Sequence, residues 1–210
     1  MTIEIFGNVS RVRRIGVGMS AGRITVKGDA GLHLGEEMTG GTITVDGNTS
    51  SWAGSMMTGG TIEIRGSAGD YIGAAYRGST RGISGGEIII RGNAGNEVGC
   101  FMRSGTIKVG GDVGQFAGIH MRDGTIFVQG NSEGRAGAQM LNGKIVICGC
   151  IPSILPTFTI DSIRTKVKVD KEKIEESFYR FIGDLAEDGN GKLFVSQTKN
   201  PHLGFYEKYL

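Results

Sequence analysis

Apolar residues recur along most of this chain with a fixed period. Segments of the form Gly-x-Ile-x-Val-x-Gly, with Ile in place of Val in some, begin at Gly22, Gly41, Gly60, Gly86, Gly105, Gly124 and Gly143. Their successive spacings are 19, 19, 26, 19, 19 and 19 residues. The opening segment MTIEIFG is one more copy, 21 residues before Gly22. The chain therefore contains seven repeat units and an eighth strand segment.

Each unit places two apolar residues at the spacing of a β-strand. If the first Gly of a segment is position one, position three is always Ile and position five is always Val or Ile. Residues two apart point to the same face of a strand, so both side chains are expected to face inward. Gly at position seven, often followed by Asn or Asp, predicts a corner with positive φ. Gly at position fourteen follows an apolar residue at position thirteen, which predicts a second inward-facing strand.

A 19-residue period with Gly corners predicts an all-β fold: a right-handed parallel β-helix of seven 19-residue coils over residues 1–150. Equivalent residues would stack about 4.8 Å apart in columns of Ile, of Val or Ile, of small apolar residues and of Met. The Met column lies at position seventeen and consists of Met19, Met38, Met57, Tyr76, Met102, Met121 and Met140. Met is unbranched and adapts to gaps, so this column is expected to fill a corner of the core and not to bind metal. Tyr76 is expected to take the place of Met in the fourth coil.

After the eighth strand segment the repeat gives way to a different pattern. Residues 151–210 are expected to form a C-terminal extension of strands and a short helix that packs on the β-helix. A strand is predicted over residues 162–169, a short helix after Asp170, and two strands, SFYRFIG and KLFVSQ, joined by the turn EDGNG. A helix over residues 171–187 is the alternative. No capping segment precedes the first strand, so a partner subunit or a second copy is expected to cover that end.

Composition excludes several classes of function. The chain has 210 residues with 38 Gly but only 3 Pro, which is not the composition of collagen. A net charge of +2 gives no electrostatic case for binding nucleic acid or a membrane surface. There is no apolar run of about 18 residues and no signal peptide, so a cytoplasmic location is expected.

No arrangement of residues predicts catalysis, and no catalytic, cofactor-binding or metal-binding residue is expected in this chain. The three His residues occupy non-equivalent repeat positions. Cys148 and Cys150 are too few for a zinc or iron–sulfur site, which needs about four ligands. They are expected to be structural thiols on the last strand and, like Cys100, to be reduced.

Two outward-facing features indicate contact with a partner. The first is at position twelve, where His33, Trp52 and Tyr71 occur in three successive coils. Their side chains are expected to form an exposed aromatic stripe, which is typical of a protein interface. The alternative is that the tail of the same chain covers the stripe.

The second feature is a group of basic residues at the interruption of the repeat. The 26-residue spacing inserts seven residues into the fourth coil, within DYIGAAYRGSTRGISGGEIII. Position eighteen then carries Arg77, Arg103 and Arg122 in adjacent coils, with Arg81 inside the insertion. Stacked like charges repel, so an acidic partner or an anionic ligand is expected beside them. A solvated basic edge is the alternative. The candidate partner contacts are therefore the stripe, Tyr76 and these four arginines.

The motifs resemble a known family. The repeating unit resembles the Gly-rich β-helix domain at the C-terminus of the glutamate synthase large subunit and, more closely, the C subunit of formylmethanofuran dehydrogenase. The segments similar to that subunit are SSWAGSMMTGG, GDYIGAAYRGSTRGISGGEIIIRGNAGNEVG, FAGIHM, RAGAQM and LPTF. The resemblance covers residues 1–160 and extends loosely to the tail, and the interrupted coil is its most specific part. This chain lacks the segment that usually precedes the first coil in that family.

The resemblance implies a non-catalytic structural subunit of formylmethanofuran dehydrogenase, which reduces CO2 to formylmethanofuran in methanogenesis. The cofactors of that complex are a molybdenum or tungsten pterin, Fe–S clusters and the metal centre of an amidohydrolase, and they are expected in partner subunits. Three alternatives are the C subunit of a bacterial formyltransferase/hydrolase complex, a free-standing glutamate-synthase-type domain, and a carbohydrate-active β-helix enzyme. The last would need acids and arginines clustered on one face, and only the arginines are evident.

Overall fold

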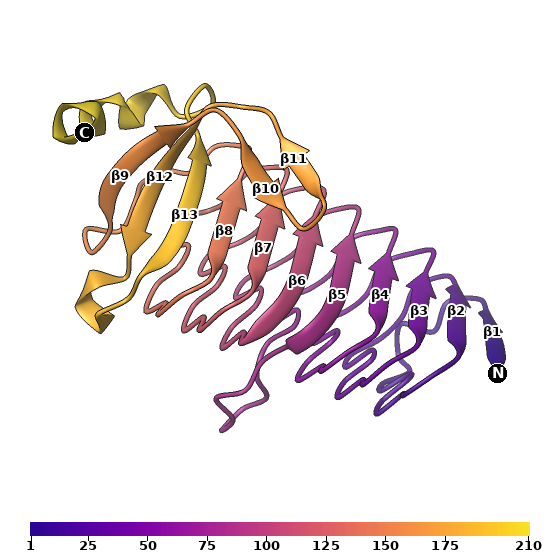
Figure 1. The fold of residues 1–210 in the computed structure, drawn as a ribbon. Coiled ribbons are helices and arrows are strands. Elements are labelled where there is room, and N and C mark those ends of the chain that lie inside the picture. The colour runs from indigo at the N-terminus through magenta and orange to yellow at the C-terminus, as the bar shows by residue number, and fades with distance from the viewer.

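The computed structural model describes residues 1–210 as a parallel β-helix with strands added at its carboxyl end (Figure 1). Its strands are β1 (Thr2–Phe6), β2 (Arg23–Lys27), β3 (Thr42–Val45), β4 (Thr61–Ile64), β5 (Ser84–Ile90), β6 (Ser104–Val109), β7 (Thr125–Val128) and β8 (Lys144–Ile147). Each of these strands pairs in parallel with the next, one coil later. The parallel β-helix predicted from the 19-residue period is therefore confirmed.

The strand register produces the core columns that the repeat predicts. Ile24 pairs with Ile43, and Ile62 pairs with Ile88 across the interruption of the repeat. From the second coil onward, the side chains at positions three, five, thirteen and seventeen are buried and belong to one continuous apolar cluster, with the exception of Tyr76. Burial of this aligned apolar surface is the main force that holds the coils together.

The second inward-facing stretch of each coil is not a strand, contrary to the sequence prediction. Neighbouring coils meet there through single bridges, as between Ala30 and Thr49. Left-handed backbone then ends the extended stretch, at positions twelve and fourteen in every coil and at position sixteen in most. The position-twelve residues have φ between 56 and 70° and are Arg14, His33, Trp52, Tyr71, Glu97, Phe116 and Arg135. Position thirteen faces inward as expected, but the left-handed residues on both sides of it leave no room for a strand.

The C-terminal extension continues the main sheet. β13 (Gly191–Ser196) pairs in parallel with β8, so that Leu193 lies beside Ile145 and extends the Ile column. β12 (Phe178–Gly183) and β9 (Thr159–Arg164) follow as antiparallel strands and complete an eleven-stranded sheet. The two strands predicted at SFYRFIG and KLFVSQ are confirmed.

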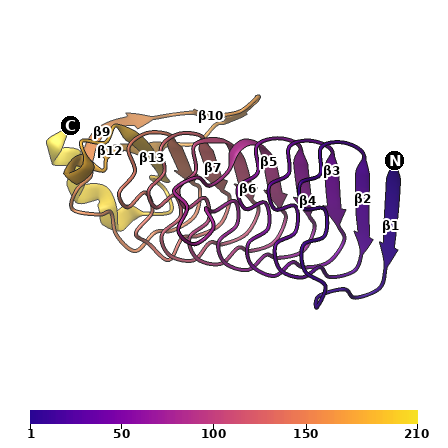
Figure 2. The ribbon, with the colours of Figure 1, turned by 90° about the horizontal axis from the view of Figure 1, so that it is seen from below.

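A β-hairpin from the extension covers part of the outer face of the sheet (Figure 2). Its strands are β10 (Val167–Val169) and β11 (Glu172–Ile174), with Asp170 in the turn at φ 51°. The Asp170 carboxylate accepts a hydrogen bond from Thr106 Oγ1 on β6 at 2.9 Å and lies 3.2 Å from Lys108 Nζ. The hairpin is therefore attached to the middle of the β-helix by polar contacts.

The helix predicted after Asp170 is wrong, as is the alternative helix over residues 171–187. The left-handed backbone of Asp170 reverses the chain there, so this residue closes a hairpin instead of capping a helix. The helical segments are two 3-10 helices, η1 (Leu185–Glu187) and η2 (Pro201–Tyr209). Neither has the length and apolar composition needed to cross a membrane.

At the amino end, apolar side chains of the first coil are exposed to solvent. Phe6 is 75% exposed and Ile3 is 39% exposed, although Ile3 belongs to a column that is buried in the later coils. β1 pairs with β2 along one edge and has no strand along the other. The expectation of a partner or a second copy at this edge stays a prediction.

Candidate partner-binding site

The interruption of the fourth coil is a loop of seven residues, 76–82. Ile83 takes position seventeen after the loop, since its N–H donates to the carbonyl of Gly73 at 2.7 Å and its carbonyl accepts from the Arg103 N–H at 2.8 Å. The methionines make the corresponding bonds in the other coils. Ile83 is fully buried, whereas Tyr76 is 44% exposed. The prediction that Tyr76 replaces Met is therefore wrong: an apolar Ile fills the column, where a Tyr hydroxyl would lack a partner.

The same register shows that the predicted row of three stacked arginines is wrong. Ser84, and not Arg77, holds position eighteen in the fourth coil, because its N–H donates to the carbonyl of Met57 at 2.8 Å. Arg103 and Arg122 keep that position in the next two coils. The expected stack of three is thus a pair, and repulsion within it gives weaker support for an anionic ligand.

Arg103 instead attaches the loop to the β-helix. Its Nε and Nη2 donate to the Thr80 carbonyl oxygen at 3.3 and 3.2 Å. The Ser79 hydroxyl oxygen accepts a hydrogen bond from the Arg81 N–H at 3.1 Å, which tightens the tip of the loop. The side chains of Arg77 and Arg81 are exposed beside it. Figure 1 shows the loop projecting beyond the coils at the amino ends of the strands, far from the β10–β11 hairpin.

Position twelve brings His33, Trp52 and Tyr71 together in one stack. The ring centroids of Trp52 and Tyr71 are 4.4 Å apart, and those of His33 and Trp52 are 5.9 Å apart, with interplanar angles of 15° and 14°. The shared left-handed backbone directs each side chain out of its coil in the same way, so side chains 19 residues apart stack. Tyr76 packs against His33 and Trp52 with its centroid 5.8 Å from each.

The stack is half-buried, so the expectation of a fully exposed stripe is wrong in degree. The alternative in which the tail covers it is also wrong. Tyr76 of the loop covers the stack, whereas the tail strands extend the sheet beyond β8 and the hairpin lies on the outer face of the sheet. Of the residues predicted as partner contacts, the structure therefore brings together His33, Trp52, Tyr71, Tyr76 and Arg77, and places Arg81, Arg103 and Arg122 along the adjoining edge.

A buried carboxylate borders the amino end of the stack. The two oxygens of Glu36 lie 3.4 Å from His33 Nδ1 and 3.1 Å from Arg14 Nε. Both contacts are within ion-pair distance, but neither is aligned as a hydrogen bond. Glu36 stands at position fifteen, where the repeat gave no signal of a role.

The loop and the stack line an open pocket of about 200 Å³. The side chains that matter for its chemistry are Trp52, Tyr71, Tyr76, Arg77, Glu97 and Phe101. The negative charge of Glu97 raises the pKa of the Tyr71 phenol above its ordinary value, and burial and Asp70 add to the effect. Burial raises the pKa of the Cys100 thiol to about 12, with Glu97 adding to it, so this thiol stays protonated at neutral pH and is a poor nucleophile.

Sequence reasoning missed Glu97 and Phe101 as pocket residues. Glu97 follows Tyr71 in the position-twelve column, and Phe101 stands at position sixteen, where its ring stacks on His120 with centroids 4.3 Å apart. A search for aromatic residues at every repeat position, and not only at position twelve, would have found this second stack.

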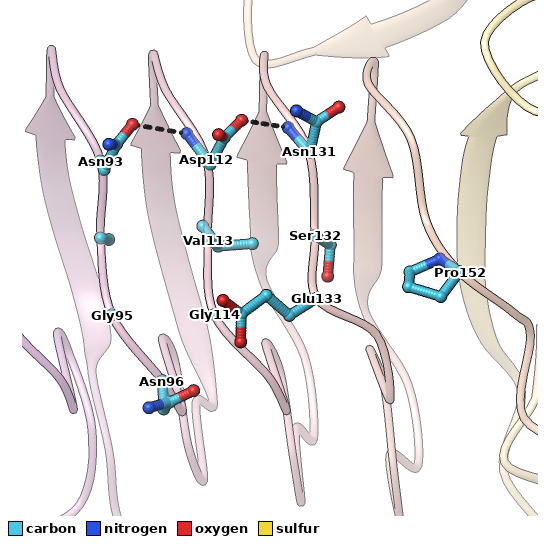
Figure 3. Close-up of a pocket in the computed structure, with 11 residues that line it drawn as sticks. Asn93, Gly95, Asn96, Asp112, Val113, Gly114, Asn131, Ser132, Glu133 and Pro152 are labelled. Carbon is cyan, nitrogen blue, oxygen red and sulfur yellow. Dashed lines mark hydrogen bonds between the residues drawn. The ribbon is translucent and has the colours of Figure 1, made fainter.

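A larger open groove of about 530 Å³ runs along another corner of the coils (Figure 3). Asn93 Oδ1 accepts from the Asp112 N–H at 2.9 Å, and Asp112 Oδ1 accepts from the Asn131 N–H at 2.6 Å. The same pattern continues from Asn131 to the N–H of Cys150 at 2.8 Å. Each of these side chains thus joins its coil to the next, and the groove is the outer surface of a structural ladder. No three His, Cys, Asp or Glu side chains gather as a metal-binding group.

No protein-family model matches this chain, and none of the curated proteins compared with it is similar. Among solved structures, it is similar to a chain in the X-ray crystal structure of the formyltransferase/hydrolase complex (FhcABCD) from Methylorubrum extorquens in complex with methylofuran. The identity is 34% and the TM-score 0.81, over 93% of this chain and 78% of that chain. This chain belongs to the family of that complex subunit. Of the two complexes that the motifs resemble, membership of this family favours the formyltransferase/hydrolase complex over formylmethanofuran dehydrogenase.

Proposed function

We propose that this chain is the C-type structural subunit of a formyltransferase/hydrolase complex, and that it carries no catalytic residue of its own. The observation that carries the proposal is the 34% identity to a chain of such a complex, maintained over 93% of this chain. The motifs around the interrupted coil, which resemble a C subunit, support the choice of subunit.

The chemistry of the surface supports a structural role. The Asn and Asp side chains of the largest groove are already hydrogen-bonded from coil to coil. The Cys100 thiol in the smaller pocket is held protonated. What the chain offers instead is a rigid rod with an aromatic stack and a projecting loop, Tyr76 to Gly82, at one edge. Exposed aromatic and Arg side chains on a fixed backbone are typical of protein interfaces.

The test is to isolate the tagged full-length chain from its own cells and to identify the bound chains by mass spectrometry. We expect the other chains of a formyltransferase/hydrolase complex, in a complex without molybdenum, tungsten or iron–sulfur clusters. A chain that is recovered alone as a stable monomer would contradict the proposal.

Formylmethanofuran dehydrogenase is the second candidate, favoured by the Tyr-Arg-Gly and Arg-Gly pattern of the interrupted coil. In that case molybdopterin- or tungstopterin-containing and amidohydrolase-like chains would accompany this one, and metal analysis would find molybdenum or tungsten together with iron. The metal content of the isolated complex therefore separates the two candidates.

A further inference from the structure

We propose that the pocket beneath the loop binds one arginine side chain of a partner subunit, which stacks on the aromatic rings and pairs with Glu97. The identity of the partner rests on the proposed function. The chemistry of the pocket does not, because it follows from side chains of this chain alone.

The size of the pocket indicates a single side chain. Its volume of about 200 Å³ is smaller than the roughly 300–1,000 Å³ of sites for small molecules and cofactors. Interfaces are commonly anchored by one large side chain that enters such a pocket near their centre. Here the pocket opens between the projecting loop and the aromatic stack, where a partner would meet the loop first.

The walls of the pocket favour a flat cation. Trp52, Tyr71, Tyr76 and Phe101 all line it, and each is only half-buried or exposed. Aromatic rings attract cations over their faces, and the guanidinium group of Arg also stacks on them as a plane. Trp52 and Tyr71 are held rigid by their own stacking, with centroids 4.4 Å apart, so little conformational freedom is lost when a side chain enters.

The charge in the pocket decides the sign of the occupant. None of the ion pairs within the chain involves Glu97. The Tyr71 hydroxyl and the Cys100 thiol lie within hydrogen-bonding reach of this carboxylate but carry no charge. An apolar occupant would therefore remove the carboxylate from water without a neutralising charge, and an acidic one would add repulsion. A guanidinium group removes both costs because it pairs with a carboxylate through two parallel hydrogen bonds. Glu97 raises the pKa of Tyr71 more than the positive charge of Arg77 lowers it, which is consistent with negative potential at this point.

Arg77 lines the same pocket but is not paired with Glu97. It is exposed on the loop, and no ion pair within the chain involves it, so its charge is available to an acidic residue of the partner. The site would then present a negative pocket with a positive rim. Alternating charges of this kind fix the register of an interface.

The first test uses the isolated full-length chain. Trp52 is the only tryptophan, so selectively excited fluorescence reports on the pocket directly. The probe is N-acetyl-arginine amide, and N-acetyl-norleucine amide is the apolar control. We expect a saturable fluorescence change with the first only, which is lost in Glu97→Gln and Phe101→Leu and retained in Glu175→Gln, a charge removal at an exposed site. Equal responses to the two probes, or an unchanged response in Glu97→Gln, would overturn the inference.

The second test uses the assembled complex. Loss of one partner of a desolvated ion pair should weaken binding of the partner subunits by about 30-fold or more in Glu97→Gln, with Glu175→Gln unchanged. If the unaltered chain assembles and Glu97→Gln assembles equally well, the pocket inference fails while the proposed function stands. If the unaltered chain binds no partner, the proposed function fails, and the fluorescence result still decides the chemistry of the pocket.

Discussion

The N–H group of Arg103 donates to the carbonyl of Ile83 at 2.8 Å, the same bond that a Met carbonyl receives from the next coil in the regular repeats. The fourth coil is therefore complete without the residues that precede Ile83. The seven-residue loop leaves the coil after Ala75 and returns at Ile83, so it adds to the coil and replaces no part of it.

Deleting residues 76–82 should therefore leave the β-helix folded. The deletion joins Ala75 to Ile83 and restores a 19-residue period, so we expect far-UV circular dichroism to be preserved and the thermal unfolding midpoint to move by only a few degrees. Deleting residues 57–63 is the matched control, since it removes the same length but destroys the register of the coil. Equal loss of structure in both variants would show that the loop is part of the coil.

Ile83→Ala should destabilise the chain much more than Tyr76→Ala. Truncation of a fully buried Ile leaves a cavity, which typically costs about 2–5 kcal/mol in the free energy of unfolding. Tyr76 loses only its packing on the half-buried stack, for which about 1 kcal/mol is expected. Urea denaturation measures the free energy of unfolding of both variants. A larger effect of Tyr76→Ala than of Ile83→Ala would show that Tyr76, and not Ile83, occupies the core column.

Two glycines with nearly the same φ provide a test of crowding in the core. Gly54 has φ +66°, and a Cβ atom there would lie 2.3 Å from Ile88 Cδ1. Gly18 has φ +63°, and a Cβ atom there would meet nothing within 4 Å. Both Ala variants force a left-handed Ala, but only Gly54→Ala overpacks the core, so it should be less stable than Gly18→Ala by about 1–3 kcal/mol. Equal unfolding free energies would show that backbone strain alone governs both.

Removing the two exposed arginines of the loop should weaken assembly and spare the fold. Arg77→Ala with Arg81→Ala is expected to lower affinity for the partner subunits about tenfold and to reduce its salt dependence, because rim charges act mainly through long-range attraction. The thermal unfolding midpoint should not change. Lys171→Ala with Lys173→Ala, on the exposed hairpin, removes the same charge elsewhere and should leave assembly intact. Unfolding of the loop variant would instead mean that these arginines serve internal packing.

The three thiols should differ sharply in reactivity. Burial raises the pKa of Cys100 and of Cys148 to about 12, with nearby carboxylates adding to it, so at pH 8 only about one molecule in ten thousand carries either thiolate. Cys150 is exposed on the surface. A thiol reagent at pH 8 should therefore modify Cys150 quickly in the native chain, and all three thiols only after denaturation. Fast modification of Cys148 in the native chain would show that the tail does not stay packed over it.

The columns of the core could be predicted from the sequence because every coil carries its own copy of the repeat. The pattern within each copy shows which of its residues face inward. Ile62 and Ile88 are 26 residues apart, yet the flanking repeats fix their pairing. The position of the loop within its coil could not be predicted in the same way. Counting from the start of the coil assigns Tyr76 to the core. Only the preference for burying Ile83 over Tyr76 assigns position seventeen to Ile83.

The pocket could not be predicted from the sequence pattern. It depends on the loop folding back onto a stack that was expected to be exposed, and on Glu97 and Phe101 from the following coil. The hairpin at Asp170 was missed for a related reason. An Asp residue favours both a helix N-cap and a left-handed turn, and the contact with Thr106, 64 residues away, is one of the tertiary contacts that favour the turn here.

The left-handed column at position twelve has a consequence for how this surface changes over time. Seven residues of very different kinds, from Arg14 to Arg135, adopt the same backbone conformation there and present their side chains at regular intervals along the rod. The fold accepts Arg, His, Trp, Tyr, Glu and Phe at this point of the coil. Single substitutions can therefore change the side chains that this surface presents without altering the backbone that carries them. The β-helix thus behaves as an array of interchangeable sites on which a binding specificity can be acquired, lost or moved from coil to coil.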